Sequence, residues 1–101
     1  MGTRLDLQSM LEKILGVRNV YYQPPESIKL QYPAIVYSRS DIYNTFANDK
    51  PYGQTKAYEL TIIDKDPDSK IVDKIAALPM CRYNRHFTSD NLNHDVFILY
   101  Y

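Results

Sequence analysis

The chain has 101 residues, enough for one hydrophobic core, and a domain of this size buries about two-thirds of the surface that its unfolded form exposes. Twelve basic residues balance twelve acidic ones without a long basic block, which argues against binding to DNA or to anionic membranes. One cysteine excludes an internal disulfide, and the lack of a bilayer-length apolar segment or a signal-peptide pattern predicts folding in a reducing cytoplasm.

The first predicted element is an amphipathic helix at residues 4–15. Thr3 is a suitable N-cap, Asp6 lies in the first turn where the helix dipole favours an anion, and Gly16 can end the helix in a left-handed conformation. The apolar side chains recur at helical spacing and share one stripe, made by Leu7, Met10, Leu11, Ile14 and Leu15.

Two strands are predicted next, at residues 17–22 and 34–43. Pro24 and Pro25 end the first strand, because proline removes a backbone donor. Residues 26–32 are expected to form a loop or an irregular edge segment, and Pro33 marks the entry to the second strand.

Residues 44–53 are rich in Asn, Asp, Pro and Gly, which favours a long hairpin tip between antiparallel strands. The same stretch carries Phe46 and Tyr52. Aromatic side chains on a polar loop predict a contact surface, although folding back onto the strands is an equally good explanation for either residue alone.

Residues 55–64 alternate regularly and predict a central strand, with Tyr58, Leu60 and Ile62 on one side. A second helix is expected to begin after it, with Asp66 as its N-cap, and to end at Pro79. Its buried stripe is expected to consist of Ile71, Val72, Ile75 and Leu78.

The C-terminal part predicts a strand at residues 81–87, a turn around 89–91 and a last strand at 94–101. Residues 96–101 are apolar on both faces, so a helix or a neighbouring subunit should cover the second face. The element order predicts a single compact α+β domain with a mainly antiparallel sheet and two helices packed on it.

Ten tyrosines and no tryptophan suggest surfaces that are exposed in a monomer and covered in a complex, because tyrosine combines an apolar ring with a hydroxyl that tolerates water. For any single tyrosine, covering a face of the sheet is the more common role. The predicted interface residues are Tyr43, Phe46, Tyr52, Phe97, Leu99 and Tyr101.

No catalytic, cofactor-binding or metal site is predicted. Asp64, Asp66 and Asp68 imitate the first half of a calcium loop, but Ser69 and Ile75 stand where that loop needs glycine and glutamate, so helix capping is favoured. The three glycines are scattered, which argues against a phosphate-binding loop.

Cys81, His86 and His94 are the remaining candidates for chemistry. Their intervals match no familiar zinc pattern, and no local signature supports a nucleophilic thiol. Ordinary strand residues are the favoured interpretation, and a small thiol or metal-dependent enzyme is the distant alternative.

The chain resembles the tail-completion proteins of long-tailed bacteriophages, also called tail terminators or tail-to-head joining proteins. The resemblance runs through most of the chain and includes the helix that closes at Leu15-Gly16. The other matching segments are NVYYQPP at 19–25, YPAIVY at 32–37, YELTIID at 58–64, DPDS at 66–69 and NLNHD at 91–95.

The resemblance implies a structural virion protein without enzymatic activity or cofactors. Such a protein would form a hexameric ring on the head-proximal end of the tail tube, stop tube polymerisation and join the tail to the head connector. Its partners would be its own copies, the tail-tube protein and a connector or stopper protein, and it would assemble in the cytoplasm of the bacterial host. Another connector component, such as a stopper or adaptor, is the close alternative.

Overall fold

The computed structural model describes the backbone of residues 3–25, 29–47 and 50–101, and the side chains of these residues except 43–47 and 50–55. Two helices and five strands follow one another in the predicted order. They are α1 (Arg4–Leu15), β1 (Val20–Tyr22), β2 (Ala34–Ala47), β3 (Lys50–Asp64), α2 (Lys70–Ala76), β4 (Cys81–Ser89) and β5 (Leu92–Tyr100).

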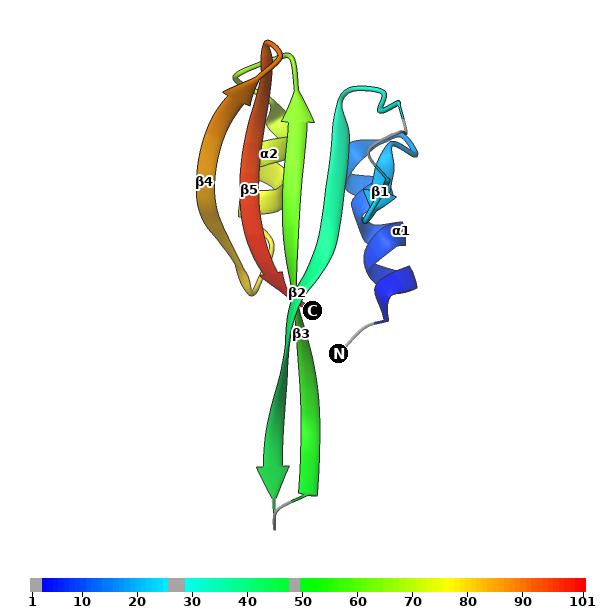
Figure 1. Cartoon of the computed structure of the whole chain (residues 1–101), viewed down its shortest axis with the longest axis vertical. Coiled ribbons are helices and arrows are strands. Elements are labelled where there is room, and N and C mark those ends of the chain that lie inside the picture. The colour runs from blue at the N-terminus through cyan, green and yellow to red at the C-terminus, as the bar shows by residue number, and fades with distance from the viewer. Residues whose placement is uncertain (1–2, 26–28, 48–49) are drawn as a thin grey trace.

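The five strands form one sheet in the order β1-β2-β3-β5-β4, and every pair except the parallel β1–β2 pair is antiparallel. Both helices contribute to one core on the same face of this sheet, with α1 beside β1 and α2 behind β3 and β5 (Figure 1). The predicted fold, an α+β domain with a mainly antiparallel sheet and two packed helices, is confirmed, and so is the central position of β3.

The core lies between the helices and the sheet. The α1 stripe buries Leu7, Leu11 and Leu15, and Ile75 of α2 is fully buried. The sheet supplies the opposite wall, which consists of Val20, Ile35, Tyr37, Tyr58, Leu60, Ile62, Phe97 and Leu99. Burying aliphatic and aromatic side chains in this way is the main favourable term in folding.

Local capping fixes where α1 begins and ends. The Thr3 hydroxyl accepts a hydrogen bond from the Asp6 amide, and the Asp6 carboxylate accepts one from the Thr3 amide, so both ends of a capping box are present. Gly16 has a φ of 85°, and its N–H donates to the Glu12 carbonyl. The left-handed conformation explains why glycine stands at this position.

The second helix is shorter than expected and begins later. Ser69, not Asp66, is its N-cap, and the serine hydroxyl accepts from the Ile71 amide. Asp66 instead belongs to the preceding turn, where its carboxylate accepts from the Asp68 amide. The prediction placed the cap too early because both Asp and Ser side chains can accept hydrogen bonds from the unpaired backbone N–H groups at the start of a helix. Helix α2 then ends at Ala76, before Pro79.

Several strand boundaries also differ from the prediction. The first strand covers only Val20–Tyr22. The predicted long hairpin tip at 44–53 is wrong in extent, because residues 44–47 continue β2, residues 50–53 begin β3, and the two segments pair with each other. Turn-favouring composition was misleading here because strand pairing overrides weak local propensity. The predicted turn after β4 is confirmed, and Asp90 and Asn91 have φ values of 53° and 62°.

The outer half of the β2–β3 hairpin projects from the body of the molecule. β1 pairs with β2 only at residues 35–37, and β5 pairs with β3 only at 57–64. We call residues 42–47 and 50–56 the arm. In the described structure they pair only with each other, apart from a hydrogen bond from the Tyr101 N–H to the Lys56 carbonyl at the base. The arm makes the molecule elongated, with principal-axis extents of 51 × 27 × 23 Å (Figure 1).

Candidate interaction surfaces

The arm carries three of the six predicted interface residues. Tyr43 and Phe46 are in its β2 strand and Tyr52 is in its β3 strand, so the structure brings all three onto one projecting element. Their side chains lie outside the described residues. The contacts expected of these three residues stay a prediction.

Phe97 and Leu99, by contrast, belong to the hydrophobic core. Phe97 is 0% exposed and Leu99 is 2% exposed, and both are enclosed by the chain's own helices and neighbouring strands. The sequence could not distinguish a strand face covered by a helix from one covered by a subunit. Because the single chain already covers them, these two residues are removed from the interface set.

Tyr101 is half-buried and packs against the core, and its backbone N–H donates to the Lys56 carbonyl over 2.9 Å. This bond places the C-terminus where the arm leaves the body. Tyr101 therefore lies beside the arm, as part of its base.

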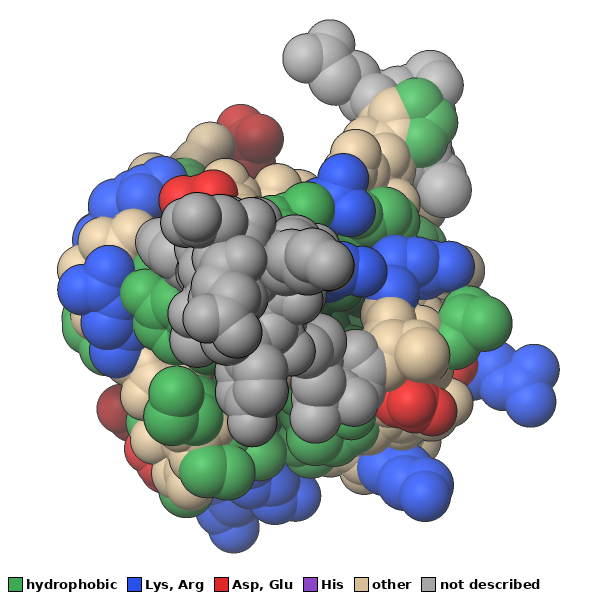
Figure 2. Space-filling model, turned by 90° about the horizontal axis from the view of Figure 1, so that it is seen from below, with side chains coloured by type: hydrophobic (Ala, Val, Ile, Leu, Met, Phe, Trp, Pro, Cys, Tyr) green, Lys and Arg blue, Asp and Glu red, His purple; other side chains and the backbone are tan. Residues whose placement is uncertain are grey.

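Two exposed apolar residues near the base of the arm were not predicted. Met80 is 68% exposed, and its carbonyl accepts from the Tyr100 amide. Ile42 is exposed and pairs with Lys56 across the hairpin. Seen along the long axis from the arm end, this side of the molecule shows hydrophobic side chains interspersed with Lys or Arg and a few Asp or Glu side chains (Figure 2). Met80 lies between α2 and β4, and its apolar character is the one sequence signal that could have identified it as a surface contact residue.

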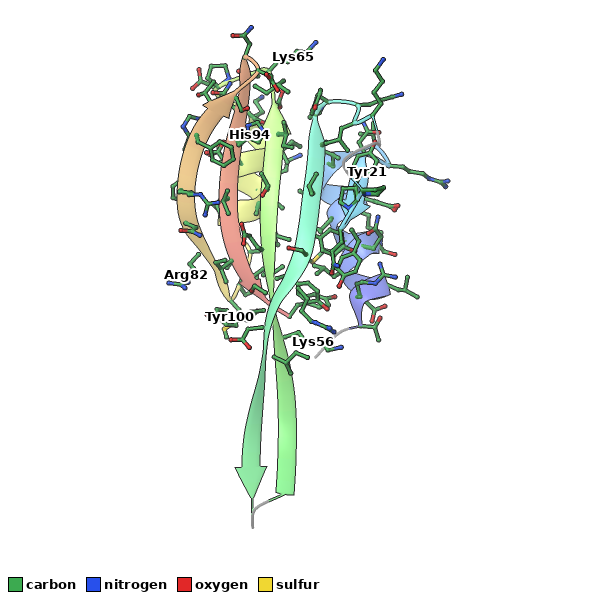
Figure 3. All side chains as sticks on the ribbon, viewed as in Figure 1. Tyr21, Lys56, Lys65, Arg82, His94 and Tyr100 are labelled. Carbon is green, nitrogen blue, oxygen red and sulfur yellow. The ribbon has the colours of Figure 1, made fainter. Side chains whose placement is uncertain are left out.

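A second surface is the sheet face without helices. Glu59 and Arg85 approach each other there at 3.8 Å, between Oε1 and Nη2. The Phe87 and His94 rings stack with centroids 4.6 Å apart, and the Arg85 guanidinium lies 5.7 Å from the Phe87 ring centre. Arg82 and His94 project from β4 and β5 on this side of the molecule (Figure 3). The surface is mixed, with aromatic, cationic and anionic groups.

β5 carries apolar residues on both faces, and the chain itself covers Val96 on the helix-free face. Val96 is 1% exposed although its side chain lies opposite the helices, between Thr61 of β3 and Arg85 of β4 in register. Cross-strand neighbours thus cover it. Ile98 is half-buried on the same face. Neither a helix nor another subunit is required for Val96.

Several tyrosines serve the body and not its surface. Tyr37 and Tyr58 are almost fully buried. The Tyr37 hydroxyl donates to Gln8 Oε1 and accepts from Arg4 Nη1, and the Gln8 amide nitrogen donates to the Val20 carbonyl over 3.0 Å. Burial raises the pKa of both tyrosines. For these residues, the common core role prevails over the interface role.

The three candidates for thiol or metal chemistry do not form a site. Cys81 is half-buried at the start of β4, and burial raises the pKa of its thiol, which disfavours the nucleophilic thiolate. His86 Nε2 is 3.2 Å from Asn93 Oδ1, and His94 Nδ1 is 3.1 Å from the Leu92 carbonyl oxygen. Among the described residues, no three His, Cys, Asp or Glu side chains lie close enough together to hold a metal ion.

The aspartates of the calcium-like stretch act in a turn. The Asp64 carboxylate accepts from the Asp66 amide over 3.1 Å, and the Asp66 carboxylate accepts from the Asp68 amide over 2.9 Å. These bonds are the usual role of Asp before a helix. Asp64 and Asp66 therefore accept hydrogen bonds from backbone N–H groups in the turn before α2, whereas Ser69 caps the helix itself.

Neither described helix has the length and apolar character needed to cross a membrane. Comparison of the chain with protein-family models, with curated proteins and with solved structures gave no match.

Proposed function

We propose that this protein is a tail terminator of a long-tailed bacteriophage, a ring-forming subunit that stops growth of the tail tube and joins the tail to the head. The proposal rests on the sequence resemblance together with one observation about the molecule, the projecting arm. Its activity would be binding alone, and it would reside in the virion at the head-proximal end of the tail.

The arm supports a role in assembly because it is poorly explained by the needs of the single chain. A hairpin of two strands is at best marginally stable in water unless a third strand or a helix covers it. In the described structure, no strand other than β2 and β3 pairs with 42–47 and 50–56, and only Lys56 at the base accepts a backbone hydrogen bond from outside them. Contact with a neighbouring subunit, with the tail tube or with the connector would supply the missing cover.

The described surface also suits a subunit that stays dispersed before it assembles. The exposed apolar side chains are spread over the chain, with Leu5 on α1, Met80 between α2 and β4, and Tyr83 and Phe87 on β4. The helix-free face mixes aromatic and charged groups such as Arg85 and Glu59. Interfaces that form between folded proteins have this mixed composition. A closed ring requires two different faces on each subunit, and the arm and the body offer them.

The deciding experiment mixes the purified protein with tail-tube subunits and measures tube length by electron microscopy. We expect tubes to stop growing once the protein is added, and rings of six subunits to be visible at the tube ends. The matched control is a Phe46→Ala, Tyr52→Ala double variant in the arm, which should fold but arrest growth poorly. Tube growth unaffected by the wild-type protein would refute the proposal.

The close alternative, a stopper or adaptor of the head-to-tail connector, predicts binding to portal or adaptor rings in place of tubes. Two helices packed on an open sheet favour the terminator, because stoppers tend toward small β-barrels. A pull-down with tubes and with connector rings in parallel separates the two candidates.

A further inference from the structure

In the described part of the chain, the sheet has four strand edges that another strand could pair with, and three of them carry features that discourage pairing. Proteins protect strand edges with charged side chains, prolines, bulges or covering elements, because an open row of backbone N–H and C=O groups recruits another strand. β1 is only three residues long, its Val20 carbonyl already accepts from Gln8 Nε2, and Pro24 follows. The β1 edge is therefore closed.

The edge at β4 and the β3 edge of the arm are guarded by their side chains. β4 carries Arg82, Arg85 and His86 and has a register shift between Tyr83 and Arg85. The β3 half of the arm carries Lys50, Pro51 and Lys56. Lysine, proline and bulges are the devices that discourage pairing at an edge.

The fourth edge, the β2 half of the arm, has neither a charge nor a proline. The register shift inside the arm, between Thr45 and Phe46, places its extra residue, Tyr52, in β3 and not in β2. Residues 42–47 read Ile-Tyr-Asn-Thr-Phe-Ala, with no charge, no proline and no glycine, and β3 is the only strand that pairs with them in the described structure. A six-residue segment of high β propensity and no charge on an open edge is a strong pairing site. The arm thus has one guarded edge and one open edge.

We propose that the open β2 edge of the arm pairs with the same edge of a second copy, so that two arms form a four-stranded antiparallel sheet in the free protein. Antiparallel pairing of identical strands is symmetric about a two-fold axis, so one surface serves both partners. The segment carries no charge and the chain carries zero net charge at pH 7, so electrostatic repulsion does not oppose the contact. The dimer hides the edge until another partner replaces it.

This inference concerns the protein before assembly and does not rest on the proposed function. The two can fail separately, because edge pairing gives a dimer of the isolated chain, whereas tube arrest is measured with tail-tube subunits present. A dimer without tube arrest would leave the edge pairing standing.

The experiment compares two lysine substitutions on residues that face each other across the arm. Asn44 of β2 pairs with Gln54 of β3, so Asn44→Lys and Gln54→Lys add the same charge at the same distance from the body. Cross-strand partners share one face of a sheet, so only the edge differs. Molecular mass is measured by size-exclusion chromatography with light scattering from low to tens of micromolar, and circular dichroism verifies folding.

We expect the wild-type protein and Gln54→Lys to dimerise, and Asn44→Lys to weaken the dimer about tenfold because it brings like charges together at the shared edge. A wild-type monomer throughout the concentration range would overturn the proposal. Equal weakening by both substitutions would also overturn it and would indicate contact through a face of the arm. A dimer that Asn44→Lys does not weaken would likewise overturn the proposal, because the contact would then lie outside the β2 edge of the arm.

Discussion

The body and the arm of this protein share two strands, β2 and β3, yet these strands are under different physical constraints in the two regions. In the body, β2 and β3 are flanked by β1 and β5 and covered on one face by α1 and α2, so Tyr37, Tyr58 and Leu60 are buried. In the arm, no third strand of the described structure pairs with these two. Stability should therefore come from the body, and association from the arm.

The largest expected difference in stability is between a phenylalanine-to-alanine substitution in the body and the same substitution in the arm. Phe97→Ala should lower the free energy of unfolding by about 3–5 kcal/mol, because it leaves a cavity in a fully buried core. Phe46→Ala in the arm should change it by less than about 0.5 kcal/mol while weakening assembly. Urea denaturation measures both. Equal destabilisation by the two variants would show that the arm is part of the folding core.

A second matched pair tests the polar contacts of the body. Gln8→Ala removes the hydrogen bonds to the Tyr37 hydroxyl and the Val20 carbonyl and should cost about 1–3 kcal/mol. Gln54→Ala in the arm should cost less than about 0.5 kcal/mol. The midpoints of thermal unfolding provide the comparison, and a Gln8→Ala midpoint at the wild-type value would contradict the assigned bonds.

Gly16→Ala tests the end of α1. An alanine at a φ of 85° is strained although no atom lies within 4 Å of the added Cβ, so the expected cost is about 1 kcal/mol. Gly16→Asn, which tolerates the left-handed conformation better, should restore part of the loss. Chemical denaturation of the wild type and the two variants measures these differences. A Gly16→Ala variant more stable than the wild type would contradict the expected strain.

High pH should weaken the body through its buried tyrosines. Burial raises the pKa of Tyr37 and Tyr58 above the ordinary value of 10.0, so the stability they contribute is fully present below pH 10 and declines as pH rises through the folded-state pKa values. Tyr37→Phe should make that decline shallower. Tyr43→Phe in the arm is the control and should follow the wild-type curve of urea midpoint against pH.

The smallest effect is expected on the helix-free face. Glu59→Gln breaks the 3.8 Å contact with Arg85, but both side chains are substantially exposed, so the change in unfolding free energy should be below about 0.5 kcal/mol. A larger loss would mean that this face contributes to the stability of the body. Added salt should leave the wild-type value nearly unchanged for the same reason.

Local chemistry determined much of this fold from the sequence alone. The spacing of Leu7, Leu11 and Leu15, the capping pair Thr3 and Asp6, and the glycine at 16 fixed α1, because helix periodicity and capping act within a few residues. The alternation at Tyr58, Leu60 and Ile62 likewise fixed the core face of the central strand.

Tertiary structure decided what local patterns leave open. Residues 44–53 carry turn-forming residues, yet most of them are paired strand, because hydrogen bonding across the hairpin outweighs a weak local preference. Phe97 and Leu99 have a pattern that suits a helix-covered face and a subunit interface equally well, and only the position of the helices assigned them to the core. Which strand edge stays unpaired depends on where the neighbouring strands end, and that is decided by the whole sheet.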